Sequence, residues 1–167
     1  MTLKEALARP GTAVLNPGAV TFQFFHQGEA EVFWDISALL QYLLSTSPLL
    51  QWMPLAGLEP WFEPGRIEID REHAMSEQVD PHTPIIAIAF EDGRLPVDGW
   101  HRIYRALQLR WQAIPTLVLP AEEEYRFRYP AALCEQLTRI ARDPGCRALE
   151  QLLQKALRRG HAVAIVV

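Results

Sequence analysis

Residues 94–106, RLPVDGWHRIYRA, hold side chains that could bind an anion at the start of a helix. An apolar, strand-like run ends at Asp98 and Gly99, and a helix-like run follows with His101 and Arg102 in its first turn. Cations at a helix N-terminus are unfavourable by about 0.3–1 kcal/mol each. The free amides of the same turn favour a bound anion, above all phosphate. We therefore expect an anion to complete this site.

The strand–turn–helix pattern assigns a role to each residue of the turn. Asp98 is expected to cap the helix by accepting a hydrogen bond from a first-turn amide, and Gly99 removes a side chain where the backbone turns. Arg102 offers phosphate a planar fork of donors. A plainer alternative is that Asp98 only caps the helix and Arg102 pairs with a nearby carboxylate. The expected phosphate-binding set is Gly99, Trp100, His101, Arg102 and Arg105.

Hydrolysis or transfer of a phosphoryl group at this turn would need a carboxylate to orient the attacking group and to hold metal. Neither a CxxC nor an HExxH motif occurs, so a zinc site made by the protein alone is not expected, and Mg²⁺ would arrive with the nucleotide. Solvation at the surface is the alternative for every acid except Asp98. The catalytic candidates are Asp98, Glu68, Asp70 and Glu72, with Glu91 and Asp92 as further acids nearby.

Hydrophobic periodicity predicts many short elements. Residues 20–34 alternate as in a β-hairpin with its turn at 27–28, and Asp35 has the position of an N-cap for the next helix. Expected helices cover 3–9, 36–44, 99–109, 130–142 and 146–159, and expected strands cover 66–70, 84–90, 94–97, 114–119 and 161–167.

Residues 48–65 contain four prolines and two glycines, so no regular element is expected throughout. Trp52, Trp61 and Phe62 are expected to pack onto the core. Alternatively, they form an exposed aromatic platform for bases or a docking segment for a protein partner.

Residues 84–119, PIIAIAFEDGRLPVDGWHRIYRALQLRWQAIPTLVL, resemble the ParB/sulfiredoxin-like fold. The shared pattern is an apolar strand after Pro, a Gly turn, a second strand, D-G-x-H-R opening a helix, and I-P before a third strand. The resemblance covers about residues 66–125. It implies a small α/β domain whose G-x-H-R turn binds nucleotide phosphates, a role that Gly99, His101 and Arg102 would inherit.

The chain departs from this family at one informative position. Sulfiredoxins have Cys between the Gly and the His, whereas this sequence has Trp100, so sulfinic-acid reductase activity is excluded. Partition-type ParB proteins carry an acid after the Gly that matters for CTP hydrolysis, and Trp100 lacks that carboxylate. The D-G-x-H-R form is closer to the kinase, ATPase and nuclease-like branches.

These observations predict an α/β (α+β) protein in three parts. Residues 1–65 form an N-terminal hairpin–helix extension packed on the core, residues 66–125 form the ParB/sulfiredoxin-like domain, and residues 126–167 form a C-terminal helical pair with a final strand. With 167 residues, 49% of them apolar, the chain is long enough for one such domain with extensions.

The charge is divided between an acidic body and a basic tail. The net charge is −4, but residues 130–167 hold six Lys/Arg and three acids, a local balance of +3. The tail could contact DNA or an acidic protein surface, or could simply be a solvated helical face. The tail residues expected to contact nucleic acid are Arg139, Arg142, Arg158 and Arg159.

No secretory signal and no apolar run of the roughly 20 residues that span a bilayer is present. We therefore expect a bacterial-type cytoplasmic protein with no membrane partner, whose Cys134 and Cys146 are reduced.

The function expected first is binding of an ATP-like nucleotide triphosphate and its phosphohydrolysis, with coupling to DNA. A second interpretation is a plasmid-type accessory protein whose DNase activity inhibits conjugative transfer. A third is a non-catalytic interaction module that binds a protein partner through residues 48–65.

Overall fold

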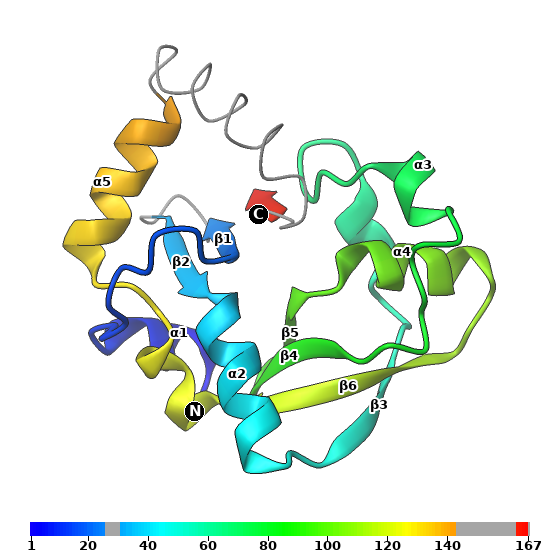
Figure 1. Cartoon of the computed structure of the whole chain (residues 1–167), viewed down its shortest axis with the longest axis horizontal. Coiled ribbons are helices and arrows are strands. Elements are labelled where there is room, and N and C mark those ends of the chain that lie inside the picture. Colours follow the sequence, from blue (N-terminus) through cyan, green and yellow to red (C-terminus); the bar gives the residue numbers. More distant parts are fainter. Residues whose placement is uncertain (26–30, 143–162, 167) are drawn as a thin grey trace.

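The computed structural model describes residues 1–25, 31–142 and 163–166. Within them the chain forms a mixed α+β structure with two β-sheets and flanking helices (Figure 1). The mixed α/β class predicted from periodicity is confirmed.

The larger sheet has four strands in the order β3-β6-β4-β5. Strand β4 (Ile85–Phe90) pairs antiparallel with β5 (Gly93–Asp98) and parallel with β6 (Ala113–Pro120), and β3 (Leu50–Pro54) pairs antiparallel with β6. Nearly all side chains of β4 are buried, as a continuous apolar run requires of a central strand. The three strands expected at 84–90, 94–97 and 114–119 are confirmed.

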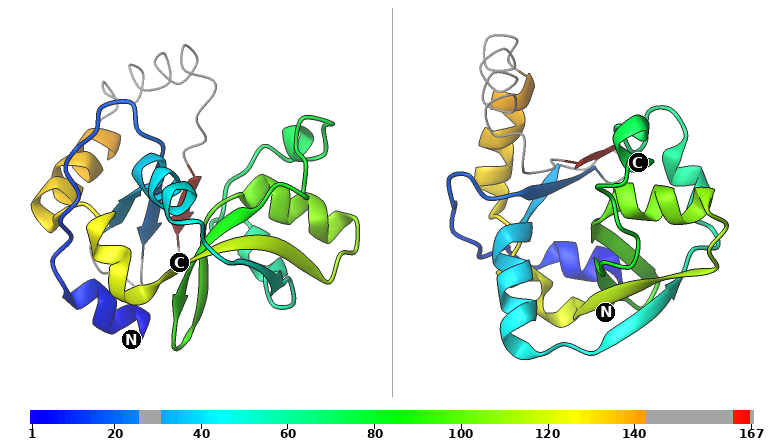
Figure 2. Two further views of the ribbon diagram at one scale, coloured as in Figure 1. Left: turned by 60° about the horizontal axis from the view of Figure 1, so that its bottom comes forward. Right: turned by 45° about the vertical axis from the view of Figure 1, so that its right-hand side comes forward.

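Helix α4 (Trp100–Gln108) connects β5 to β6 and packs on the sheet through Ile103 and Ala106, both fully buried. The short helix α3 (Arg71–Ala74) packs against α4 in turn. Figure 2 shows this pair as a layer beside the four-stranded sheet, away from the smaller sheet.

The smaller sheet has the order β2-β1-β7. Strands β1 (Thr21–Phe25) and β2 (Val32–Asp35) form the predicted antiparallel hairpin, and β7 (Val163–Val166) joins β1 in parallel. Asp35 caps α2 (Ile36–Thr46) by accepting a hydrogen bond from the Ala38 amide at 2.8 Å, as expected.

The remaining elements are two helices and two 3₁₀ turns. The helices are α1 (Leu3–Ala8) and α5 (Ala131–Arg142), and the 3₁₀ turns are η1 (Glu59–Phe62) and η2 (Ala121–Arg126). The helix expected at 146–159 lies outside the described residues.

One expectation about the segment before β4 is wrong. Residues 66–70 form no strand beyond a single bridge at Ile67, because the chain turns back on η1, where the Ile67 amide donates to the Trp61 carbonyl at 3.0 Å. The Pro-rich stretch 48–65 is not one regular element, as expected, but it contains strand β3, which joins the larger sheet.

The aromatic side chains of residues 48–65 divide between core and surface. Phe62 is buried and Trp61 packs against Trp100, as expected, but Trp52 on β3 is 61% exposed. Among the described residues, no helix combines the length and apolar character needed to cross a membrane.

Candidate functional site

The turn between β5 and α4 can be made only with glycine at position 99. Gly99 is the N-cap of α4 with φ 95°, in the left-handed region. A Cβ atom there would lie 2.4 Å from Ile85 Cγ2 and 2.8 Å from Ile85 Cβ. The predicted N-cap role of Asp98 is wrong, because Gly99 occupies that position and no side chain caps the helix.

The first turn of α4 therefore keeps its amides without a side-chain acceptor. The first intrahelical hydrogen bond runs from the Ile103 amide to the Gly99 carbonyl at 2.9 Å. The amides of the residues before Ile103, among them Trp100 and Arg102, precede the first bond of this kind. Together with the helix dipole, such amides attract negative charge.

Arg102 is held by protein acceptors on three sides. Its guanidinium donates to the Asp98 carboxylate at 2.7 Å, to the Thr83 carbonyl at 3.2 Å and to the Pro84 carbonyl at 2.5 Å. The side chain remains 18% exposed. These bonds use three of its five N–H donors, so Arg102 both fixes the turn and keeps donors for a ligand.

Trp100 faces the protein interior. Its side chain is fully buried, 5.8 Å from the ring centroids of both Trp61 and Phe62. Its indole nitrogen is buried without a hydrogen-bond partner among the described groups. Position 100 can therefore contact an anion through its backbone amide rather than through the indole.

Arg105 takes a role different from the one predicted. One guanidinium nitrogen donates to the carbonyls of Ser76 and Val79, the latter at 2.8 Å. These contacts fasten the connection between α3 and β4 to the side of α4. Arg105 is therefore not part of the proposed phosphate-binding set.

A pocket of about 260 Å³ opens at the N-terminus of α4. It brings together four of the five predicted phosphate-binding residues and one catalytic candidate, Asp98. The other wall comes from the α3–β4 connection, which the sequence-based prediction did not include. The complete lining is His73, Gln78, Val79, Asp80, Thr83, Asp98, Gly99, Trp100, His101 and Arg102.

The other three catalytic candidates do not line this pocket. Glu68 and Glu72 are exposed. Asp70 caps α3 by accepting a hydrogen bond from the His73 amide at 2.9 Å, which holds the pKa of this carboxyl below its usual value, with smaller contributions from the nearby imidazoles of His73 and His101. Asp98 is thus the only one of the four that could act on a ligand in this pocket.

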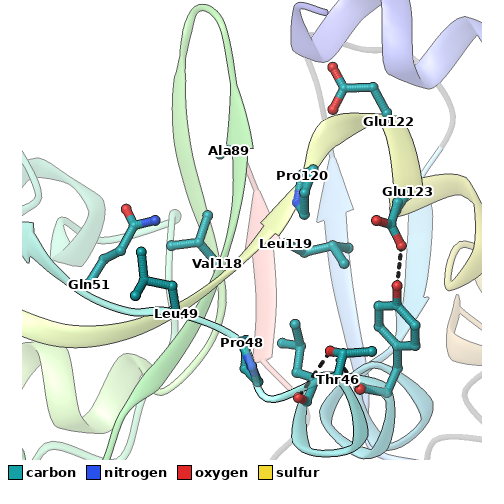
Figure 3. Close-up of a pocket in the computed structure, with 12 residues that line it drawn as sticks. Thr46, Pro48, Leu49, Gln51, Ala89, Val118, Leu119, Pro120, Glu122 and Glu123 are labelled. Atoms are coloured by element: carbon teal, nitrogen blue, oxygen red, sulfur yellow. Dashed lines mark hydrogen bonds between the residues drawn. The ribbon is translucent and has the colours of Figure 1, made fainter.

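A second, larger pocket of about 470 Å³ lies between α2 and the end of β6 (Figure 3). Glu122 and Glu123 lie at one side of it, and the Glu123 carboxylate accepts a hydrogen bond from the Tyr42 hydroxyl at 2.5 Å. This bond raises the pKa of Tyr42. The lining of this pocket contains two carboxylates and no basic side chain, so it offers phosphate no cationic donor, and none of the predicted site residues lies in it.

Two of the four predicted nucleic-acid contacts lie in the described part of the chain. Arg139 is exposed on α5, and Arg142 ends that helix. Arg158 and Arg159 lie outside the described residues. In the described ranges no three His, Cys, Asp or Glu side chains are grouped so as to hold a metal ion.

Comparisons with family models, with curated proteins and with solved structures find no match to this chain.

Proposed function

We propose that the pocket at the N-terminus of α4 binds the phosphates of a nucleotide triphosphate. The observation that carries the proposal is the uncapped first turn of α4 opening into a pocket lined by His101 and Arg102. Backbone amides, an imidazole and a guanidinium together form a donor set suited to phosphate oxygens. The ParB/sulfiredoxin-like pattern of residues 66–125 supports the same assignment.

Mg²⁺ is proposed to enter with the nucleotide, coordinated by its phosphates. The two pocket carboxylates already have internal partners. Asp98 accepts from Arg102, and Asp80 accepts from the His82 amide at 2.9 Å. These residues do not form a metal site of their own, so we assign the protein no catalytic step through the metal.

Calorimetric titration with ATP, CTP and GTP, with and without Mg²⁺, tests the proposal. His101→Ala removes a pocket donor without emptying the core, and we expect it to weaken binding about tenfold, the usual order for a charge-assisted hydrogen bond. Gln51→Ala, in the acidic pocket of Figure 3, is the control and should bind like the parent. If His101→Ala binds nucleotide as tightly as the parent, the phosphate site does not lie at the N-terminus of α4.

Phosphohydrolysis is a further proposal, supported by Asp98 and His101 lining the same pocket. Release of labelled phosphate from ATP by the parent, lost in Asp98→Asn with binding retained, is the expected result. Coupling to DNA and DNase activity rest on the basic tail and stay predictions. A plasmid nicking assay run beside the ATPase assay separates these activities.

An interaction module is the second candidate function, favoured by exposed apolar side chains on and beside β3. Leu49 is 77% exposed and Trp52 61% exposed. If the parent binds no nucleotide, this surface becomes the leading site, and the first step is to compare the proteins captured by the parent with those captured by Trp52→Ala.

A further inference from the structure

Two histidines far apart in the sequence meet at the mouth of the α4 pocket. His73 lies on α3 and His101 in the first turn of α4, and their rings lie edge to face with centroids 5.3 Å apart. Both side chains line the same pocket. The G-x-H-R motif contains only His101, so nothing in the motif points to His73.

His73 is held in this position by three independent contacts. Asp70 caps the short helix that carries it. Arg71 donates to the Phe62 carbonyl at 2.9 Å and fastens the start of α3 to η1. Arg105 fastens the chain just after α3 to α4 through Val79. The His73 imidazole is therefore part of a pocket wall that hydrogen bonds hold in place.

The charged groups around the two imidazoles favour an anionic ligand between them. Asp98 is paired with Arg102, and Asp80 is engaged by His82. Asp70 is exposed at the start of α3, and its charge acts on both rings. An imidazole that is protonated becomes a donor at both nitrogens and a cation. Two such rings facing one pocket suit a ligand with several negative charges.

We propose that His73 is a second imidazole ligand for the phosphate chain, acting with His101, and that the pair selects polyphosphates over monophosphates. This inference rests on the proposed function. A polyphosphate carries more negative charge than a single phosphate, and it offers separate phosphoryl groups to the donors of α4 and to the His73 imidazole of α3.

The test uses inorganic tripolyphosphate and inorganic phosphate as probes, with the full chain and without metal. His73→Phe keeps an aromatic ring against His101 and removes both ring nitrogens. We expect it to lower tripolyphosphate affinity about tenfold at pH 6.0 and by a smaller factor at pH 8.0, because a protonated imidazole is a cation that donates at both nitrogens, whereas a neutral one is uncharged and donates at one. Phosphate affinity should change less than threefold. The ratio of variant to parent cancels the titration of the probe itself.

Imidazole NMR resonances of the parent supply a reading that does not depend on the variant folding. Saturating tripolyphosphate at pH 6.0 should shift the ring resonances of both His73 and His101. The indole resonance of Trp52, which lies on β3 and outside the pocket lining, should not shift and is the internal control.

The outcomes separate the two proposals. If the parent binds tripolyphosphate but neither His73→Phe nor the His73 resonance responds, the role of His73 is overturned while the phosphate site stands. If the parent binds neither tripolyphosphate nor ATP at either pH, the phosphate site itself is overturned, and the role of His73 with it.

Discussion

Gly99 shows how one residue decides whether the candidate site exists. Its positive φ turns the chain from β5 into α4, and the absence of a Cβ lets the turn approach Ile85. Both conditions must hold for the first-turn amides to face the pocket. Gly18, Gly57, Gly65 and Gly93 have a positive φ but open space around an added Cβ, so they meet only the first condition and provide a matched comparison.

Gly99→Ala should destabilise the protein more than Gly57→Ala. Both residues have positive φ, so each variant costs about 1–2 kcal/mol from the backbone alone. Only at position 99 does the added methyl meet a core side chain, which adds about 1–3 kcal/mol of overpacking. Urea unfolding of the two variants measures the difference, and equal losses would contradict the close approach to Ile85.

Arg102→Ala should reduce stability as well as nucleotide binding. The substitution removes the donor from two backbone carbonyls and leaves the Asp98 carboxylate unpaired, at a cost of about 1–3 kcal/mol. Thermal unfolding measured beside calorimetry separates the two effects. A variant that unfolds like the parent would show that these hydrogen bonds do not stabilise the turn.

The residues that meet at the turn were predictable from the sequence, but the contact that each side chain makes was not. Sequence order placed Asp98, Gly99, His101 and Arg102 at one turn, and a short motif keeps such neighbours together. The sequence could not show that Asp98 pairs with Arg102 rather than capping the helix. Nor could it show His73, because that residue reaches the site only through the packing of α3 on α4.

At the scale of elements, the pocket depends on how the α3–β4 connection is attached to α4. That connection contains little regular structure and supplies four of the ten residues that line the pocket. Arg105 anchors its first part, since its guanidinium reaches carbonyls 26 and 29 residues earlier in the chain, and Arg102 anchors its end through the carbonyls of Thr83 and Pro84. Tertiary hydrogen bonding of this kind leaves no periodic signal in the sequence.

Arg105→Met should loosen residues 74–84 while leaving α4 in place. Methionine fills part of the space of the arginine stem but donates nothing to the carbonyls of Ser76 and Val79, which costs about 1–3 kcal/mol. Hydrogen exchange should quicken in residues 74–84 by at least tenfold and change little in β4. Unchanged exchange there would mean that other contacts hold the connection.

Hydrophobic periodicity did not predict the strands correctly at β3 and at residues 66–70. The pattern at 66–70 alternates like a strand, yet these residues form only one bridge, at Ile67, because the chain folds back on η1 through the bond from the Ile67 amide to the Trp61 carbonyl. Strand β3 ends in Pro54 and exposes Trp52, so it lacks the usual strand signature. It is an edge strand, where proline and incomplete burial are tolerated.

At the scale of the whole molecule, one hydrophobic core joins the two sheets. Phe22 and Trp34 of the smaller sheet belong to the same buried cluster as Ile85 and Ile114 of the larger sheet. The sequence could not show that one core joins the three expected segments. Helix and strand patterns indicate which face of an element is buried, but not which other element covers that face. The molecule should therefore unfold as one cooperative unit.

A buried ion pair connects several elements of this unit, and removing it tests whether the whole molecule unfolds cooperatively. Glu124 of η2, 1% exposed, pairs with Arg128, 5% exposed, at 3.0 Å. The Glu124 carboxylate also accepts from the Trp34 indole at 2.8 Å, and Arg128 donates to the carbonyls of Ala6 and Arg9. One pair thus connects α1, β2 and the segment after the larger sheet.

Glu124→Gln should destabilise the entire molecule, because it leaves the Arg128 cation buried without a counter-charge. We expect a loss of about 3–5 kcal/mol in the free energy of unfolding. Glu123→Gln is the matched control on the same 3₁₀ turn. Its pair with Arg126 is 35% and 48% exposed, and Gln keeps an acceptor for the Tyr42 hydroxyl, so the loss should be no more than about 1 kcal/mol. Urea unfolding should shift equally by circular dichroism and by tryptophan fluorescence, and hydrogen exchange should quicken in both sheets. A loss confined to the smaller sheet would show that the two sheets unfold separately despite their shared core.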